Sequence, residues 1–128
     1  MSAQEIEALT REFFDTFARN DLAATATMLS DDLEVIDHVP YRFDTKQEFV
    51  EFLQGAMAGI ESGTFGCRQL SCRVFNDNGA VANMYDTFSG MGKNGKPLST
   101  HGRTSLVFAK EGGQWKIVSC HFSPLPGH

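Results

Sequence analysis

Apolar residues recur at helical spacing along the first part of the chain. A Ser-x-x-Glu capping box at residues 2–5 precedes the first apolar run. That run consists of Ile6, Leu9, Phe13 and Phe17. The pattern predicts a first amphipathic helix, for which Asn20 provides a stop signal.

Two further helices are expected before Gly63. Asp21 is a suitable N-cap for a short second helix. The apolar positions of that helix are Leu22, Ala26 and Leu29. Thr45 and Glu48 form a second capping box, which starts a third helix. Its apolar positions are Phe49, Phe52, Leu53, Ala56 and Ile60, and we expect it to end near Gly63.

The remaining pattern is that of strands. The stretch SDDLEVIDHVP, residues 30–40, predicts a first strand that ends in Asp37, between the second and third helices. After Gly63, four strand-like runs are separated by clusters of turn residues. They cover residues 65–75, 80–89, 98–109 and 115–122. Links this short favour antiparallel neighbours.

Helices followed by a strand meander predict an α+β fold. We expect a single domain over residues 1–128, in which three N-terminal helices pack against a strongly curved, mostly antiparallel sheet to form a cone. The interior of such a cone is the natural place for a pocket. Asp37, where the first strand ends, is then either a turn residue or a carboxylate aimed into that pocket.

Composition narrows the possible partners. The chain has 128 residues, 41% of them hydrophobic, and its eleven phenylalanines indicate a large core or an apolar cavity. A net charge of -5 argues against binding nucleic acid or an anionic membrane, since both need a basic surface. No apolar stretch approaches the ~20 residues of a membrane span. The three cysteines lack metal or disulfide spacing and the N-terminus is unlike a signal peptide, so we expect a cytoplasmic protein with reduced thiols.

Two stretches carry a resemblance to a known family. RNDLAATATMLSDDLEVID, residues 19–37, resembles the helix–strand segment of the nuclear transport factor 2-like superfamily, especially its SnoaL-like and ketosteroid isomerase-like branch. HGRTSLVFAKEGGQWKIVSCHFSPLP, residues 101–126, resembles the closing hairpin of that branch, and also the end of the calcium/calmodulin-dependent kinase association domain. The resemblance covers nearly the whole chain and implies the cone-shaped, cystatin-like fold. It does not by itself imply one function, because this scaffold hosts many activities.

The resemblance implies a role for Asp37. In ketosteroid isomerases, an acid at this position shuttles a proton between carbons next to a carbonyl, while a Tyr and a protonated Asp stabilise the enolate oxygen. The positions of these two donors are occupied here by Phe13 and Thr104, which supply neither a phenol nor a carboxylic acid. One such donor is often worth about 3–4 kcal/mol. Classical ketosteroid isomerase activity is therefore not expected.

The resemblance also implies which side chains face the pocket. If Thr104 points inward, alternation along the strands places a polar set on the same side. The inward residues of the last three strands would be Asn83, Tyr85, Thr87, Ser89, Gly102, Thr104, Leu106, Phe108, Val118, Cys120 and Phe122. The convex face would hold Met84, Asp86, Phe88, His101, Arg103, Trp115, Ile117 and His121. Because that outer face is partly apolar, we expect a homodimer formed through it.

Two interpretations of the inward set remain open. As a pocket for a small apolar organic ligand, it would have Asp37 and Tyr85 as catalytic residues, with Asp37 as the general base. Its ligand-binding residues would be Phe13, Phe17, His38, Asn83, Thr87, Thr104, Leu106, Phe108, Cys120 and Phe122. The protein would then be an isomerase, cyclase or dehydratase for an apolar carbonyl or hydroxyl compound, with no cofactor and no metal. As a satisfied internal hydrogen-bond network, the same set would belong to a non-catalytic ligand-binding or self-association module.

Overall fold

A six-stranded sheet and three helices make up the computed structural model, which describes residues 2–37 and 42–126. The helices are α1 (Ser2–Ala18), α2 (Leu22–Met28) and α3 (Lys46–Ala58). The strands are β1 (Leu29–Ile36), β2 (Arg42–Phe43), β3 (Ile60–Phe75), β4 (Gly79–Gly92), β5 (Pro97–Glu111) and β6 (Gln114–Pro124). Their order in the sheet is β2-β1-β6-β5-β4-β3. β1 pairs with β6 in parallel, and the other neighbouring pairs are antiparallel.

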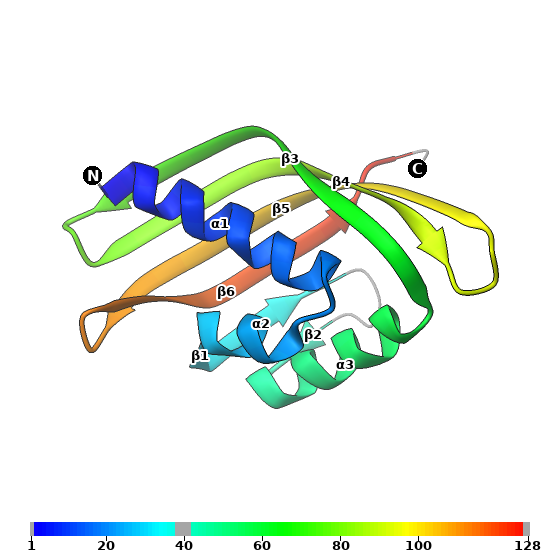
Figure 1. The fold of residues 1–128 in the computed structure, drawn as a ribbon. Coiled ribbons are helices and arrows are strands. Elements are labelled where there is room, and N and C mark those ends of the chain that lie inside the picture. The colour runs from blue at the N-terminus through cyan, green and yellow to red at the C-terminus, as the bar shows by residue number, and fades with distance from the viewer. Residues whose placement is uncertain (1, 38–41, 127–128) are drawn as a thin grey trace.

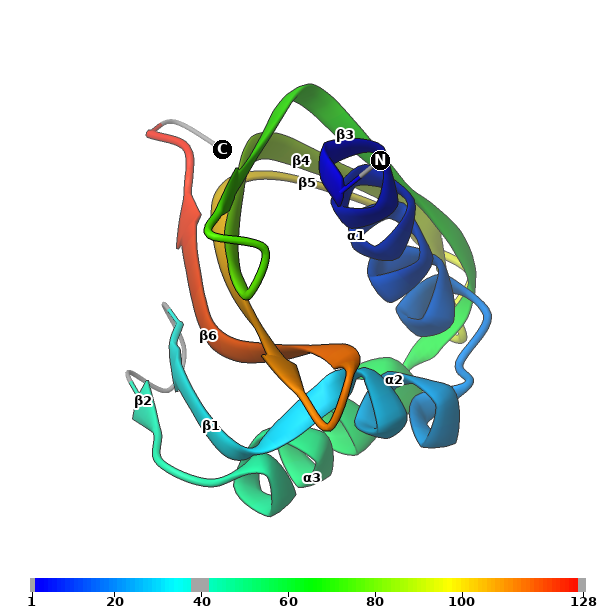
Figure 2. The same cartoon turned by 90° about the vertical axis from the view of Figure 1, so that its left-hand side faces the viewer.

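The sheet bends strongly, and the helices lie on its inner side (Figures 1 and 2). α1 packs against β3, and α3 packs against β1. Figure 2 shows β3 to β6 curling so that α1 lies inside the bend. The predicted α+β architecture, with a curved and mostly antiparallel sheet, is confirmed. Within the described residues, no helix is long and apolar enough to cross a membrane.

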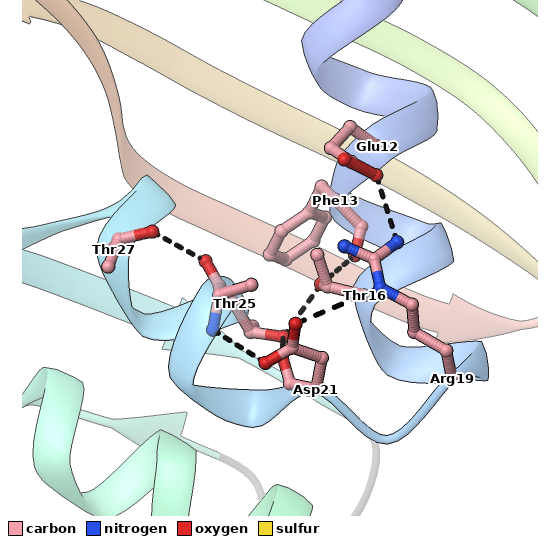
Figure 3. Close-up of polar contacts among 8 residues, drawn as sticks. Glu12, Phe13, Thr16, Arg19, Asp21, Thr25 and Thr27 are labelled. Carbon is pink, nitrogen blue, oxygen red and sulfur yellow. Dashed lines mark hydrogen bonds and ion pairs between the residues drawn. The ribbon is translucent and has the colours of Figure 1, made fainter.

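The turn between α1 and α2 is held by a chain of buried hydroxyl groups (Figure 3). Thr25 Oγ1 donates to Thr16 Oγ1 at 2.7 Å, and Thr16 Oγ1 donates to the carbonyl oxygen of Phe13 at 2.6 Å. An Asp21 carboxylate oxygen accepts from the backbone N–H of Ala24 at 3.2 Å, which confirms the predicted N-cap of α2. These bonds fix α2 against the end of α1, and β1 follows directly from α2.

The capping box of α3 is also confirmed. Thr45 Oγ1 accepts from the backbone N–H of Glu48 at 3.1 Å, and a Glu48 carboxylate oxygen accepts from Thr45 Oγ1 at 3.2 Å. The predicted end of this helix near Gly63 is wrong. α3 ends at Ala58, and Ile60 begins β3, where it pairs with Gly92 of β4. A β-branched residue after the cap residue is better placed in the sheet than in a last helical turn.

The facing of β4 differs from the prediction. Met84 lies opposite Thr104 in the antiparallel pair with β5, and directly opposite residues point to the same face. The inner face of β4 therefore carries its even-numbered residues, of which Ala80, Ala82, Met84 and Phe88 are buried. The four residues predicted to point inward lie on the outer face instead: Asn83, Tyr85, Thr87 and Ser89. Tyr85 is 43% exposed.

Asp86 and Phe88 therefore lie on the inner face, although both were predicted on the convex face. A second correction concerns β6. Its register with β5 shifts between Val107 and Phe108, which makes β6 irregular around Val118. Trp115 and Ile117, predicted on the convex face, are consequently buried, as is Cys120 further along the same strand.

Replacing Met84 by Ala is expected to lower the free energy of unfolding by about 2–5 kcal/mol, because the change leaves a hole in the core. The control is Ser89→Ala on the outer face of the same strand, which should cost less than about 1 kcal/mol. Urea unfolding of the two variants measures the difference. A larger loss for Ser89→Ala than for Met84→Ala would contradict the facing of β4.

Candidate functional site

A cavity of about 610 Å³ lies between α1, α3 and the inner face of the sheet. Phe14 and Phe17 of α1 line one side of it, and α3 lines another. The contributions of α3 and of the start of β3 are Phe49, Phe52, Leu53, Ala56, Met57, Ile60 and Phe65. The sheet and the chain after β1 contribute Asp37, Asp86, Phe88, Thr100, His101, Gly102, Arg103, Phe122, Ser123 and Pro124.

Aromatic rings dominate the wall. Seven of the eleven phenylalanines, all of which lie within the described residues, line this cavity. Four of them form one continuous group, in which the ring of Phe65 lies 5.3 Å from Phe14, 5.9 Å from Phe17 and 4.8 Å from Phe88 between centroids. On the opposite wall, the rings of Phe49 and Phe122 stack at 6.1 Å. Such walls favour an apolar, ring-containing guest.

Two acidic residues line this aromatic cavity. Asp37 follows β1 directly, and Asp86 projects from the inner face of β4. Thr104 Oγ1 donates a hydrogen bond of 2.5 Å to Asp86 Oδ2, which orients that carboxylate. Thr104 is 3% exposed, so this hydrogen bond is shielded from solvent on the Thr104 side.

Gly102 gives the Asp86 carboxylate its room. Gly102 lies directly opposite Asp86 in the pair of β4 with β5. A Cβ atom at residue 102 would lie 3.1 Å from Asp86 Oδ1, which is tighter than an ordinary van der Waals contact. The glycine therefore lets the carboxylate lie across the neighbouring strand, within reach of Thr104.

Cys120 lies in the sheet beside β1, opposite Val35. Burial raises the pKa of the Cys120 thiol far above its usual range, and the charge of the nearby Asp37 carboxylate raises it further. The thiol therefore stays protonated and packs as a small apolar side chain. Burial likewise raises the pKa values of Cys67 and Cys72, and all three cysteines are free.

A family model described as a SnoaL-like domain matches residues 6–126, nearly the whole chain. The chain belongs to the SnoaL-like domain family. A search of curated proteins gave no match.

Solved structures of low sequence identity share the fold of this SnoaL-like protein. A nuclear transport factor 2-like superfamily protein from Salmonella enterica serovar Typhimurium is 24% identical, with a TM-score of 0.85 over 98% of this chain and 93% of that one. A protein from Xanthomonas campestris, provisionally assigned as a calcium/calmodulin-dependent protein kinase II association domain, is 20% identical, with a TM-score of 0.85 over 97% and 88%. A provisionally assigned scytalone dehydratase from Novosphingobium aromaticivorans is 13% identical, with a TM-score of 0.85 over 94% and 81%.

The residues singled out from the sequence fall into four places in this SnoaL-like structure. Asp37, Phe17 and Phe122 line the cavity. Five others are buried in the fold: Phe13, Thr104, Leu106, Phe108 and Cys120. Three lie on the outer face of β4, namely Asn83, Tyr85 and Thr87. His38 lies outside the described residues.

Asp86 is one of several cavity residues that the sequence analysis missed. The signal was present, because Ala82, Met84 and Phe88 alternate with the more polar Asn83, Tyr85 and Thr87, and Asp86 shares the parity of the apolar set. The resemblance to ketosteroid isomerases favoured the opposite parity and concealed this pattern. Thr104 has no carboxyl group where ketosteroid isomerases carry a protonated Asp, but Asp86 brings one to the hydroxyl of Thr104 from the neighbouring strand.

The outer face of the sheet carries a separate, polar hollow of about 560 Å³. Tyr85, Arg103 and His121 line it together with several small polar residues. Ser105 Oγ donates to Asn83 Oδ1 at 2.5 Å, and Arg103 donates to the carbonyl oxygen of Pro124 at 3.3 Å. The side chain of Tyr85 is thus separated from Asp37 and Asp86 by the sheet.

Proposed function

We propose that the inner cavity binds a small, uncharged organic compound with a flat ring system and a polar group directed at Asp37 and Asp86. The observation that carries this proposal is the presence of two acidic residues, Asp37 and Asp86, in the wall of one cavity that is also lined by seven phenylalanines. The aromatic walls would hold the rings by apolar contact, and the Asp37 carboxylate would accept a hydrogen bond from a hydroxyl. A negatively charged ligand would be disfavoured by the charge of an ionised Asp37.

The chemistry that suits this arrangement is proton transfer without a cofactor. Asp37 would take a proton from a carbon next to the carbonyl of the bound compound and return it to another carbon, as an isomerase, cyclase or dehydratase requires. Asp86, in its protonated form, would donate a hydrogen bond to the carbonyl oxygen, which carries the developing charge. Thr104 would act as a positioning residue, because it holds Asp86 through a 2.5 Å hydrogen bond. Tyr85 has no place in this proposal, since it lies on the opposite face of the sheet.

One structural relative supports the choice of chemistry. The Novosphingobium protein of the same fold is provisionally assigned as a scytalone dehydratase, an enzyme that removes water. At 13% identity, this relative supports the idea that the fold can host a dehydration reaction, but it does not indicate the substrate of this chain.

Deuterium exchange at the acidic carbon of 2-tetralone, a flat bicyclic ketone, tests the role of Asp37. We expect the wild-type protein to accelerate this exchange at least about tenfold over buffer, because a positioned base lowers the barrier. Asp37→Asn should abolish the acceleration while leaving calorimetric binding of 2-naphthol, a neutral bicyclic ligand, within about tenfold of wild type. Proton NMR in deuterated buffer follows the exchange.

Asp32→Asn is the matched control, because Asp32 lies exposed on the same strand. It should change neither exchange nor binding. Exchange that is equally fast in Asp37→Asn and wild type would contradict Asp37 as the base. Binding without any exchange in the wild type would favour the non-catalytic ligand-binding module.

Self-association through the outer sheet face is a second candidate function. The exposed side chains of Tyr85 and Val107 support it, since they leave apolar surface around the polar hollow. A structural relative from Xanthomonas campestris, provisionally assigned as an association domain, supports it as well. Two copies meeting through this face would form the homodimer expected from the sequence and would leave both inner cavities free.

Light scattering at micromolar concentration tests this homodimer. The wild type should have twice the mass of one chain, and Val107→Glu should have the mass of one chain, because the change places a charge in the apolar part of the interface. Gln54→Glu, on an exposed position of α3, is the control and should remain dimeric. A single-chain mass for the wild type would overturn the proposed interface.

A further inference from the structure

The ring of Phe88 packs directly against the backbone of two glycines, Gly63 and Gly90. Gly63 of β3 and Gly90 of β4 are directly paired in the sheet. A Cβ atom built on Gly63 would lie 2.3 Å from Phe88 Cζ and 2.4 Å from Phe88 Cε1. One built on Gly90 would lie 2.8 Å from the same Cζ atom. The ring therefore fits where it does because both residues lack side chains.

At residue 63, glycine is needed because there is no room for a side chain, and the backbone conformation does not require it. Neither Gly63 nor Gly90 has a positive φ, a feature that the structure records for three other glycines. An alanine at residue 63 would thus be compatible with the backbone φ angle. Its Cβ atom would lie 3.2 Å from the carbonyl oxygen of Ser89, and its main clash would be with the Phe88 ring. The strand backbone lies on one side of the ring, so the clash would push the ring towards the cavity.

Phe88 lies at a position where such a shift matters. It follows Asp86 by two residues on the inner face of β4, on the side of the hairpin that joins β4 to β5. It is 7% exposed and lines the same cavity as Asp86. Its ring contacts Phe65 at 4.8 Å between centroids, which fixes it on its second side.

We propose that Phe88, seated on Gly63 and Gly90, limits the length of ligand that the cavity accepts beside Asp86. This inference rests on the proposed function, since it assumes that the inner cavity holds the ligand. The cavity then selects uncharged bicyclic compounds and rejects those with an alkyl chain on the ring edge remote from the hydroxyl. Phe88 is a specificity-determining residue and takes no part in proton transfer.

Calorimetric titration with 2-naphthol and 6-propyl-2-naphthol tests this limit. The wild type should bind 2-naphthol at least about tenfold more tightly than its propyl derivative. Phe88→Ala should shift the ratio of the two affinities towards the propyl compound by at least about tenfold, because a ring-sized space becomes free. Phe88→Leu, which keeps more of the packing, should shift the ratio in the same direction by a smaller factor.

A double-mutant cycle tests whether the contact between Gly63 and the Phe88 ring controls the size of the cavity. Gly63→Ala should weaken 2-naphthol binding by about tenfold, since the displaced ring narrows the cavity. In the double variant Gly63→Ala with Phe88→Ala, binding should recover to the level of Phe88→Ala alone, because the ring that caused the clash is gone. Gly55→Ala is the matched control, since a Cβ atom there meets nothing within 4 Å. Circular dichroism and thermal unfolding of each variant check that it folds.

The possible failures are distinct. Absence of 2-naphthol binding by folded wild-type protein overturns the proposed function, and this inference with it. Binding of 2-naphthol with an affinity ratio that is the same in wild type, Phe88→Leu and Phe88→Ala overturns the inference alone. An effect of Gly63→Ala that persists without the Phe88 ring also overturns it, because the glycine would then act through the backbone.

Discussion

The pairing of β4 with β5 decides what this SnoaL-like protein presents to its interior. Because Met84 lies opposite Thr104, the even-numbered residues of β4 are on the inner face of the sheet, which faces the helices. Asp86 is thereby placed beside Thr104 and across from Gly102, which together orient its carboxylate and leave it room. A shift of one residue in this pairing would turn Asp86 and Phe88 outward and bring Asn83 and Tyr85 inside. The cavity would then have a different lining and one acid fewer.

The walls of the cavity are continuous with the hydrophobic core. Phe13, Leu106 and Phe108 are fully or almost fully buried in the same core cluster that contains the lining residues Phe14 and Phe17. The lining rings contact one another in two groups, around Phe65 and around Phe49. Rings held on several sides cannot turn freely into the space between the groups. The same cavity combines aromatic walls with two acidic residues, and this combination is why we interpret it as a binding site.

The sequence predicted most of the architecture, because its signals were local. The capping residues Asp21 and Thr45 correctly predicted the starts of α2 and α3, and the turn clusters correctly predicted the breaks between the four long strands. The site was harder to predict, because the face of a strand depends on its neighbour. Asp86 follows the apolar alternation of β4, but only the pairing with Thr104 shows that this side is the inner one. The register shift in β6 is likewise a property of two strands, and it buries Trp115 and Ile117 without a local signal.

A crystal structure of the protein grown with 2-naphthol tests the central claim most directly. The account predicts one naphthol molecule between the two phenylalanine groups, with its hydroxyl oxygen within hydrogen-bond distance of Asp37 or Asp86. A solid interior in which the rings have closed on one another would contradict it. So would a ligand seated only on the outer face of the sheet, beside Tyr85 and Arg103.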